Sequence, residues 1–260
     1  RDLPAYDQII QGMSGVMSIT GAPENAPYRV GYPMADTIGG ITAAFAVAAA
    51  LADRNRTSGT FIDVSMLEAV MGWAVSNHLI AGREPKPMGN ENVTASPSGT
   101  FQTQDGLLNI AANKQEQFEA VCHVVGLPQL IADERFHERQ SRLQNRAELK
   151  ALLEEAMSTK TTEEWWKLFN RAGVPAGPVY SVPQALDHPQ VATRGMVGTF
   201  ENAPGVGRDI RLVRTGFKVN GETPRVYTPP PALGQHADEI LADLGYSAEE
   251  IDALREEKAV

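Results

Sequence analysis

The 260-residue chain is 42% hydrophobic and 21% charged, a composition typical of a globular protein that can bury a sizeable core. Its formal net charge of -9 and its lack of a Lys/Arg-rich run argue against a nucleic-acid partner, so an anionic substrate must be recognised by local groups. The single cysteine, Cys122, excludes internal disulfides and cysteine-based metal sites and favours a reducing compartment, the cytoplasm or an organelle matrix.

Residues 1–83 are predicted to form part of one domain, organised around a long apolar helix. Apolar residues recur at helical spacing from Tyr6 to Ile19, and a loop rich in glycine and proline follows. The apolar helix is expected from Thr37 to about Leu51. The run is shorter than the roughly 20 residues that span a bilayer, so we expect a helix packed on all sides within the protein and no membrane insertion. A strand over 61–66 and a helix over 67–82 complete this part.

One carboxylate, Asp36, stands at the beginning of the apolar helix, where an N-cap residue is expected. One interpretation is structural: its side chain accepts a backbone N–H of the first turn. The other is a nucleophilic or proton-transferring carboxylate, kept ionised by the helix dipole and directed into a cleft. The local pattern alone leaves both interpretations open.

A polar segment follows at residues 84–99. Its glycine, proline and asparagine content is too rich in turn formers for a helix or strand. A connection of this length inside a compact domain is usually a functional loop or disordered. We therefore treat it as a candidate active-site loop.

Residues 100–227 are predicted to form a small α+β domain. It begins with a hairpin, whose strands over 100–103 and 107–112 are joined by the turn formers Asp105-Gly106. Further helices are expected over 115–125, over 146–157, after the capping box Thr161-x-x-Glu164 and after Ser181. Further strands are expected over 178–180, 196–200, 209–212 and around Phe217. The fold class is therefore α/β with mixed helix and sheet content.

Residues 228–260 are predicted to return to the first domain. They begin with a proline-rich extended linker and end in two short helices, the second opened by Ser247. The whole sequence contains no P-loop, no G-x-G-x-x-G, no G-x-S-x-G and no histidine pair at metal-binding spacing, so we expect no metal site.

Several stretches in a fixed order resemble the family III CoA-transferases, the CaiB/BaiF family that includes formyl-CoA transferase and carnitine CoA-transferase. They occupy residues 4–8, 11–15, 18–21, 30–36, 54–57, 63–69, 173–179 and 233–241. The resemblance implies a Rossmann-like large domain with a small α+β domain. It also implies that the chain lacks an N-terminal segment of the family that carries most CoA contacts, and that the intact protein is an interlocked homodimer.

The resemblance implies that Asp36 is the covalent nucleophile, a role for which a carboxylate needs no activating base because it is ionised at neutral pH. It assigns the thioester site to Tyr6 and a closing role to the loop around Gly89. Contacts with substrate or CoA are implied for seven residues: Ala5, Asp7, Gly89, Asn90, Glu91, Asn113 and Lys114. Coenzyme A is then a substrate and product, with an acyl-CoA and a small carboxylic acid as the partners, and no cofactor is permanently bound.

Two alternatives remain beside CoA transfer. The family includes 2-methylacyl-CoA racemases, and a hydrolase-like relative belongs to the same alternative. The racemase histidine falls on Tyr6 and a racemase acid falls on or beside Gln115; neither replacement suits proton exchange at neutral pH. The second alternative is an inactive fragment that acts only in assembly. The chain also lacks the glycine run of formyl-CoA transferase, and its polar loop together with Arg29 favours a small dicarboxylate such as succinate.

Overall fold

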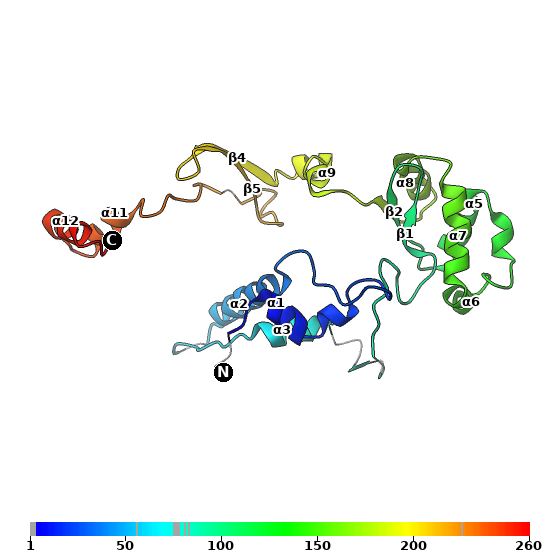
Figure 1. Ribbon diagram of the computed structural model, residues 1–260, viewed down its shortest axis with the longest axis horizontal. Helices are drawn as coiled ribbons and strands as arrows, with labels where there is room; N and C mark the ends of the chain where they lie inside the picture. The colour runs from blue at the N-terminus through cyan, green and yellow to red at the C-terminus, as the bar shows by residue number, and fades with distance from the viewer. Residues whose placement is uncertain (1–3, 56, 75–78, 81, 83, 225) are drawn as a thin grey trace. The chain divides into compact units, whose positions relative to one another are not determined.

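The computed structural model describes residues 4–55, 57–74, 79–80, 82, 84–224 and 226–260 (Figure 1). It contains two compact units, one ending at Val179 and one beginning at Tyr180. Both units combine helices with antiparallel strands, which confirms the mixed fold class. The division falls inside the range 100–227 that the sequence predicted as one small domain.

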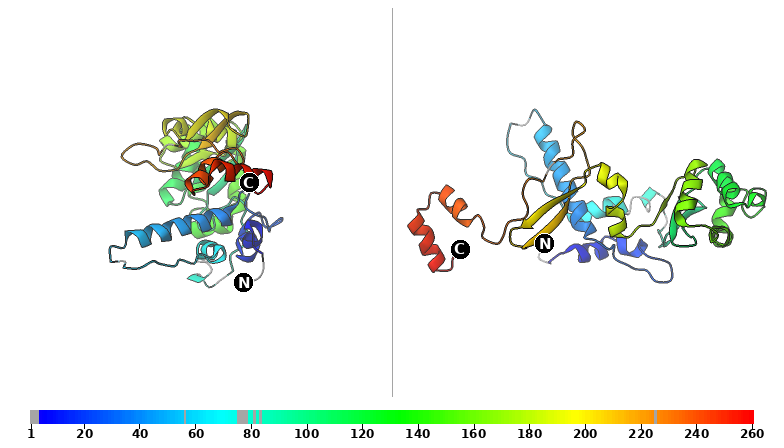
Figure 2. Two further views of the ribbon diagram at one scale, coloured as in Figure 1. Left: turned by 90° about the vertical axis from the view of Figure 1, so that its left-hand side faces the viewer. Right: turned by 90° about the horizontal axis from the view of Figure 1, so that it is seen from above.

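The first part of unit 1 is helical and packs around a small apolar core. Its elements are α1 (Asp7–Met13), the 3-10 helix η1 (Val16–Ile19), α2 (Met34–Ala52) and α3 (Met66–Ala74). The three α-helices lie side by side in Figure 1 and in the left view of Figure 2. The core comprises Ile10, Val16, Met34, Ala35 and Val70. Gly39 permits the close approach of α3, because a Cβ there would lie 3.0 Å from Cγ of Met66.

The strand predicted over residues 61–66 is wrong. Residues 61–65 form neither helix nor strand, and α3 begins at Met66. Phe61, the bulkiest residue of the predicted strand, is 92% exposed. The alternating pattern is present, but the described residues supply no neighbouring strand to pair with it. An isolated strand leaves its backbone groups without partners. The helix predicted over 67–82 is observed as α3, and its predicted continuation lies partly outside the described residues.

Helix α2 differs from the expected helix in length and in burial. It begins at Met34, three residues before the predicted Thr37, and ends at Ala52. Among the described residues it alone is long and apolar enough to cross a membrane, with a mean hydropathy of 1.6 over an 18-residue window. Only 11% of that window is buried. The expectation of a helix packed on all sides is therefore not met among the described residues, where the main contacts of α2 are with α1 and α3.

The second part of unit 1 is a three-stranded antiparallel sheet with helices on one face. The strands β1 (Ser98–Gln102), β2 (Leu107–Ala111) and β3 (Ala176–Pro178) lie in the order β1-β2-β3. The predicted hairpin is confirmed, with Thr100 opposite Asn109. The helices are α5 (Gln115–Val125), η2 (Pro128–Ile131), α6 (Arg139–Gln144), α7 (Arg146–Met157) and α8 (Thr162–Arg171).

Side-chain alternation gives the sheet one apolar face and one polar face. Phe101, Leu108 and Ile110 are at most 2% exposed and join a large helical core. Thr100 and Asn109 alternate with them and therefore lie on the opposite face. The helical core therefore packs on the apolar face, while Thr100 and Asn109 lie on the other face, where their side chains hydrogen-bond to each other at 2.6 Å.

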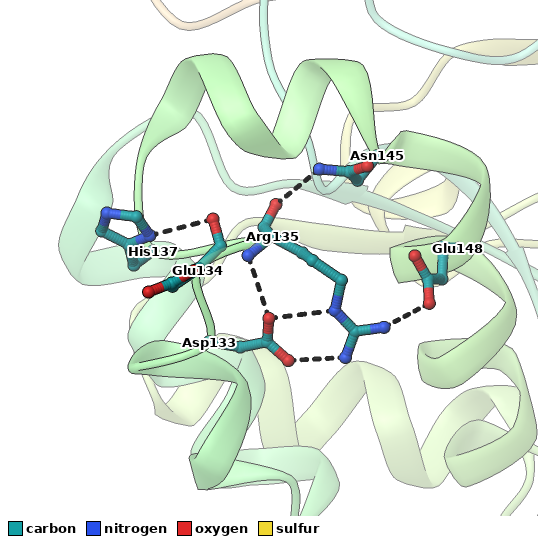
Figure 3. A network of polar contacts seen from close by, with 6 residues as sticks. All are labelled: Asp133, Glu134, Arg135, His137, Asn145 and Glu148. Carbon is teal, nitrogen blue, oxygen red and sulfur yellow. Dashed lines mark hydrogen bonds and ion pairs between the residues drawn. The ribbon is translucent and has the colours of Figure 1, made fainter.

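The connection between α5 and α7 is fixed by a charged network (Figure 3). Arg135 pairs with Asp133, at 2.6 Å from Nη2 to Oδ2, and with Glu148 of α7. Asn145 donates its side-chain amide to the carbonyl of Arg135 at 3.1 Å. The hydrogen bonds from Arg135 hold the pKa of the Asp133 carboxyl at about 2, below its usual 3.8.

Unit 2 contains short helices and one hairpin. The elements are α9 (Val182–Leu186), α10 (Pro189–Thr193), β4 (Val197–Ala203), β5 (Arg208–Val213), α11 (Ala237–Asp243) and α12 (Ala248–Glu256). The predicted Ser181 and Ser247 capping boxes are confirmed at α9 and α12. The strand predicted around Phe217 is wrong, since only an isolated bridge between Val219 and Glu222 forms there.

Candidate active site

Asp36 lies in the first turn of α2 and leaves its carboxylate exposed. It is the third residue of the helix, and Pro33 occupies the N-cap position. Among the described residues, no side-chain hydrogen bond or ion pair involves Asp36. Asp36 therefore does not act as the helix cap, which was one of the two interpretations of the sequence.

The cap of α2 is Asp7, supplied by α1. Its Oδ1 accepts the backbone N–H of Ala35 at 2.8 Å, a donor that the helix itself cannot satisfy. Its Oδ2 accepts the side-chain amide of Gln11 at 2.8 Å. Both oxygens of Asp7 are thus engaged with protein groups that position the turn carrying Asp36. The contact of Asp7 with substrate or CoA stays a prediction.

Gln11 completes this arrangement and was not singled out from the sequence. Its side chain is fully buried and its Oε1 accepts the backbone N–H of Val30 at 2.9 Å. Its Nε2 also donates to the carbonyl of Tyr32 at 3.3 Å. A glutamine one turn after Asp7 was the available signal, because residues four apart on a helix are neighbours. Gln11 fixes the segment that leads into α2.

Tyr6 and Ala5 precede α1 and lie on the surface. The carbonyl of Tyr6 accepts the N–H groups of Ile9 and Ile10 at 2.9 and 3.1 Å, while its side chain is 77% exposed. Tyr6 directly precedes Asp7 in the chain, and Asp36 directly follows Ala35. The hydrogen bond between Asp7 and Ala35 therefore brings the two predicted catalytic segments together.

The second group of predicted residues is the Gly89–Glu91 loop, which comprises Gly89, Asn90 and Glu91. The N–H of Gly89 donates to the carbonyl of Gly21 at 2.8 Å, and the Glu91 carboxylate pairs with Lys150 of α7 at 2.7 Å. The loop lines a cavity of about 670 Å³ above the polar face of the sheet. It also lines a cavity of about 630 Å³ beside the loop that begins at Thr20.

Asn113 and Lys114 follow β2 and lead into α5. Oδ1 of Asn113 accepts the hydroxyl of Ser98 at 3.2 Å, so Asn113 is tied to the beginning of β1. Lys114 is the N-cap residue of α5 and its side chain is 70% exposed. Among the described residues, no hydrogen bond or ion pair joins Asp36 to the Gly89–Glu91 loop or to either of these residues. The structure thus holds the predicted site residues in two groups within unit 1.

Comparisons with known proteins agree with the motifs. A family model described as CoA-transferase family III matches residues 1–237. The chain is similar to a succinyl-CoA:glutarate CoA-transferase of Mus musculus, at 35% identity over 92% of this chain and 55% of that protein. It is similar to an acetyl-CoA:oxalate CoA-transferase of Acetobacter aceti, at 39% identity over 75% of this chain and 51% of that protein.

A solved structure extends the similarity to three dimensions. The crystal structure of a CaiB/BaiF family protein from Brucella suis has a TM-score of 0.78 and 32% identity, covering 92% of this chain and 63% of that one. The chain thus spans between 51% and 63% of the length of these three proteins.

Proposed function

The chain belongs to CoA-transferase family III, and from that premise we propose that the natural protein moves CoA from an acyl-CoA to the carboxylate of a free acid, with Asp36 as nucleophile. The observation that carries the proposal is the exposed carboxylate of Asp36 at a helix start whose cap is supplied by Asp7. A carboxylate that caps a helix is engaged by backbone donors, whereas Asp36 keeps both oxygens available for attack.

The proposed reaction proceeds through two covalent states of Asp36. A carboxylate oxygen attacks the thioester carbonyl, the C–S bond breaks, and CoA leaves as the thiolate from an aspartyl anhydride. The thiolate then attacks the Asp36 carbonyl carbon, which releases the donor acid and leaves an aspartyl-CoA thioester. The acceptor carboxylate reverses these steps: it displaces the thiolate to form a second anhydride, and the thiolate then attacks the acceptor carbonyl and regenerates Asp36. No oxidant and no net proton are needed.

Small dicarboxylic acids are the proposed substrates. The names of the two relatives described above contain succinyl-CoA with glutarate and acetyl-CoA with oxalate, and three of these four acyl or acid components are short dicarboxylic acids or derive from one. Arg29 lies directly before Val30, the residue that Gln11 binds at the approach to α2. Its exposed guanidinium supplies a local positive charge in a protein whose net charge is -9. A second carboxylate on the substrate would be attracted to it.

We further propose that the intact protein is a homodimer. We also propose that it is located in a reducing compartment, either the cytoplasm or an organelle matrix. Support for an additional partner surface comes from α2, on which Ile41, Phe45 and Leu51 are between 64% and 74% exposed. Contiguous exposed apolar surface of this kind usually marks an interface.

Acyl exchange tests the proposal. The natural protein is incubated with a panel of acyl-CoAs and isotopically labelled free acids in deuterated water, and the products are followed by mass spectrometry. We expect labelled acyl-CoA from succinate or glutarate, without deuterium at the α-carbon. Asp36→Asn is expected to abolish exchange, because an amide is not a nucleophile. The variant should remain folded, because the Asp36 side chain does not cap α2. Deuterium incorporation without exchange would instead identify a racemase, and retained turnover in Asp36→Asn would exclude this nucleophile.

A further inference from the structure

The Glu91–Lys150 ion pair joins the Gly89–Glu91 loop to the rigid part of unit 1. Nζ of Lys150 lies 2.7 Å from Oε1 of Glu91 and also donates to the carbonyl of Thr100 in β1 at 2.8 Å. The two side chains are only 30% and 17% exposed, respectively. A pair in this partly desolvated position is less screened than a surface pair. The pair therefore ties the loop to α7.

The base of this contact is well ordered by packing. Leu149 and Leu153, on either side of Lys150 in α7, are fully buried in the large core. Glu154, one turn beyond Lys150, accepts the backbone N–H of Gln102 at 2.9 Å and so ties α7 to the end of β1. Lys150 thus projects from a fixed helix toward a loop that has no regular structure of its own.

The loop is seated on β1 by backbone contacts that depend on Gly99. Glu91 forms an isolated antiparallel bridge with Gly99, and the N–H of Asn92 donates to the carbonyl of Ser98 at 2.9 Å. A Cβ at Gly99 would lie 2.8 Å from the carbonyl oxygen of Asn90 and 2.9 Å from Oε2 of Glu91. Only glycine allows the loop and the Glu91 carboxylate to approach the strand this closely.

The seated loop forms a wall shared by both cavities. Gly89, Asn90 and Glu91 line the cavity of about 670 Å³ above the sheet and the cavity of about 630 Å³ on the other side of the loop. Lys150 lines only the second cavity. A change at Lys150 would therefore reach the first cavity through the position of Glu91.

We propose that Lys150 is a positioning residue that acts through Glu91 to hold the Gly89–Glu91 loop as the wall of the two cavities, and that the loop held in this way keeps water from the acyl-transfer intermediates. The role applies if the protein transfers CoA as proposed above. Water that reaches the aspartyl-CoA thioester attacks the Asp36 carbonyl, breaks the C–S bond, and yields the Asp36 carboxyl group and free CoA thiol. A loosened loop therefore diverts the enzyme from transfer to hydrolysis.

The test combines Lys150→Met, Glu91→Gln and the double variant in the natural protein. For both single variants we expect kcat for transfer to fall about tenfold to a hundredfold, the scale for misplaced active-site groups, with a smaller change in KM. The share of acyl-CoA that is hydrolysed should rise about tenfold in both. The double variant should be no worse than Lys150→Met alone, because Lys150→Met already removes the pair with Glu91 along with the hydrogen bond to the Thr100 carbonyl. Lys167→Met is the matched control, since its pair with Glu163 is 2.6 Å long, close to the 2.7 Å of the Lys150–Glu91 pair, but its side chain is 56% exposed.

A readout independent of catalysis keeps the inference separate from the proposed function. Hydrogen exchange of the Glu91 and Asn92 amides, which bond to Met88 and Ser98, should accelerate about tenfold in Lys150→Met and in Glu91→Gln but not in Lys167→Met. Glu91→Gln retains an oxygen acceptor and serves if Lys150→Met does not fold. Unchanged exchange and an unchanged hydrolysis share in the folded variants would overturn the role of Lys150. An inactive natural protein with the expected exchange pattern would instead overturn the proposed function alone.

Discussion

Tyr6 is exposed to solvent and directly precedes Asp7, the residue that caps α2 and positions the turn with Asp36. We expect the Tyr6 hydroxyl to donate a hydrogen bond that orients the thioester. Tyr6→Phe should therefore lower kcat about tenfold to a hundredfold without abolishing transfer. The free energy of unfolding, measured by urea titration, should stay unchanged because the ring is 77% exposed. A destabilised variant with normal turnover per folded molecule would show that Tyr6 is only structural.

At the same scale, the sequence located Asp36 but not the residues that position it. The pattern of Pro33, Asp36 and an apolar helix identified the helix start to within three residues. It could not show that the cap comes from another helix, because the contact between Asp7 and Ala35 spans 28 positions in the chain. Gln11 was hidden for the same reason. Its spacing of four residues from Asp7 indicated a contact between those two side chains, but its hydrogen bonds with Val30 and Tyr32 span 19 and 21 positions in the chain.

The start of α2 provides a prediction at the scale of the element. Asp7→Ala removes the acceptor for the Ala35 N–H and one partner of Gln11, and helix caps of this kind contribute about 0.5–2 kcal/mol. We expect a loss of unfolding free energy in that range, together with a lower kcat because the turn that carries Asp36 shifts.

Glu24→Ala is a suitable comparison for this variant. Glu24 is an exposed carboxylate of the neighbouring loop and makes no side-chain hydrogen bond among the described residues. The Glu24→Ala variant loses one negative charge, as Asp7→Ala does, and should leave both the free energy of unfolding and the turnover unchanged. Equal behaviour of the two variants in urea titration and acyl exchange would show that Asp7 does not hold α2.

The connection between α5 and α7 makes stability depend on acid pH. Arg135 holds the pKa of Asp133 at about 2 in the folded protein, below the 3.8 of the unfolded chain. The folded state thus binds fewer protons at this group, so the stabilisation is present above pH 3.8 and is lost as pH falls toward 2. The cost of Asp133→Asn in urea titrations should shrink over this interval, and it should be small at neutral pH because solvent reaches the Arg135 side chain, which is 46% exposed.

Glu134→Gln is the matched control for Asp133→Asn. Glu134 neighbours Asp133 and also loses one negative charge, but its carboxylate makes no hydrogen bond or ion pair among the residues drawn in Figure 3. Its effect on unfolding free energy should not change across the acid interval. If Asp133→Asn costs the same at pH 2 as at pH 3.8, the contact does not hold in solution.

The sequence predicted an element correctly where the interacting residues lie close together in the chain. The Asp105-Gly106 hairpin and the capping boxes at Thr161, Ser181 and Ser247 were all confirmed. Predictions failed for the strand over 61–66, whose alternation needs a neighbouring strand that the described residues do not supply. Sheet formation depends on distant pairing, whereas turns and caps are decided within a few residues.

At the scale of the whole molecule, α2 exposes apolar side chains, and the proteins compared above are longer than this chain. Between 51% and 63% of each compared protein is covered by this chain. We predict that the 260-residue chain alone does not transfer CoA. The released CoA thiolate must be held close to the anhydride for its return attack, and positioning of this kind lowers the barrier by on the order of several kcal/mol.

The measurement is an exchange assay of the chain alone beside a version extended with the segments of a relative that this chain does not cover. The extended version should exchange acyl groups, and its α2 amides should be better protected from hydrogen exchange than those of the chain alone. Full activity of the chain alone would place the CoA site within these residues and would refute the prediction.

The covalent role of Asp36 is tested most directly by mass spectrometry of the enzyme during turnover. The natural protein is mixed with succinyl-CoA, quenched in acid and digested, and the peptide that contains Asp36 is measured. We predict that this peptide gains the mass of one CoA moiety, that hydroxylamine removes it, and that Asp36→Asn does not acquire it. Turnover with CoA attached to a different residue, or with no covalent CoA at any residue under conditions that accumulate the intermediate, would contradict the proposed mechanism.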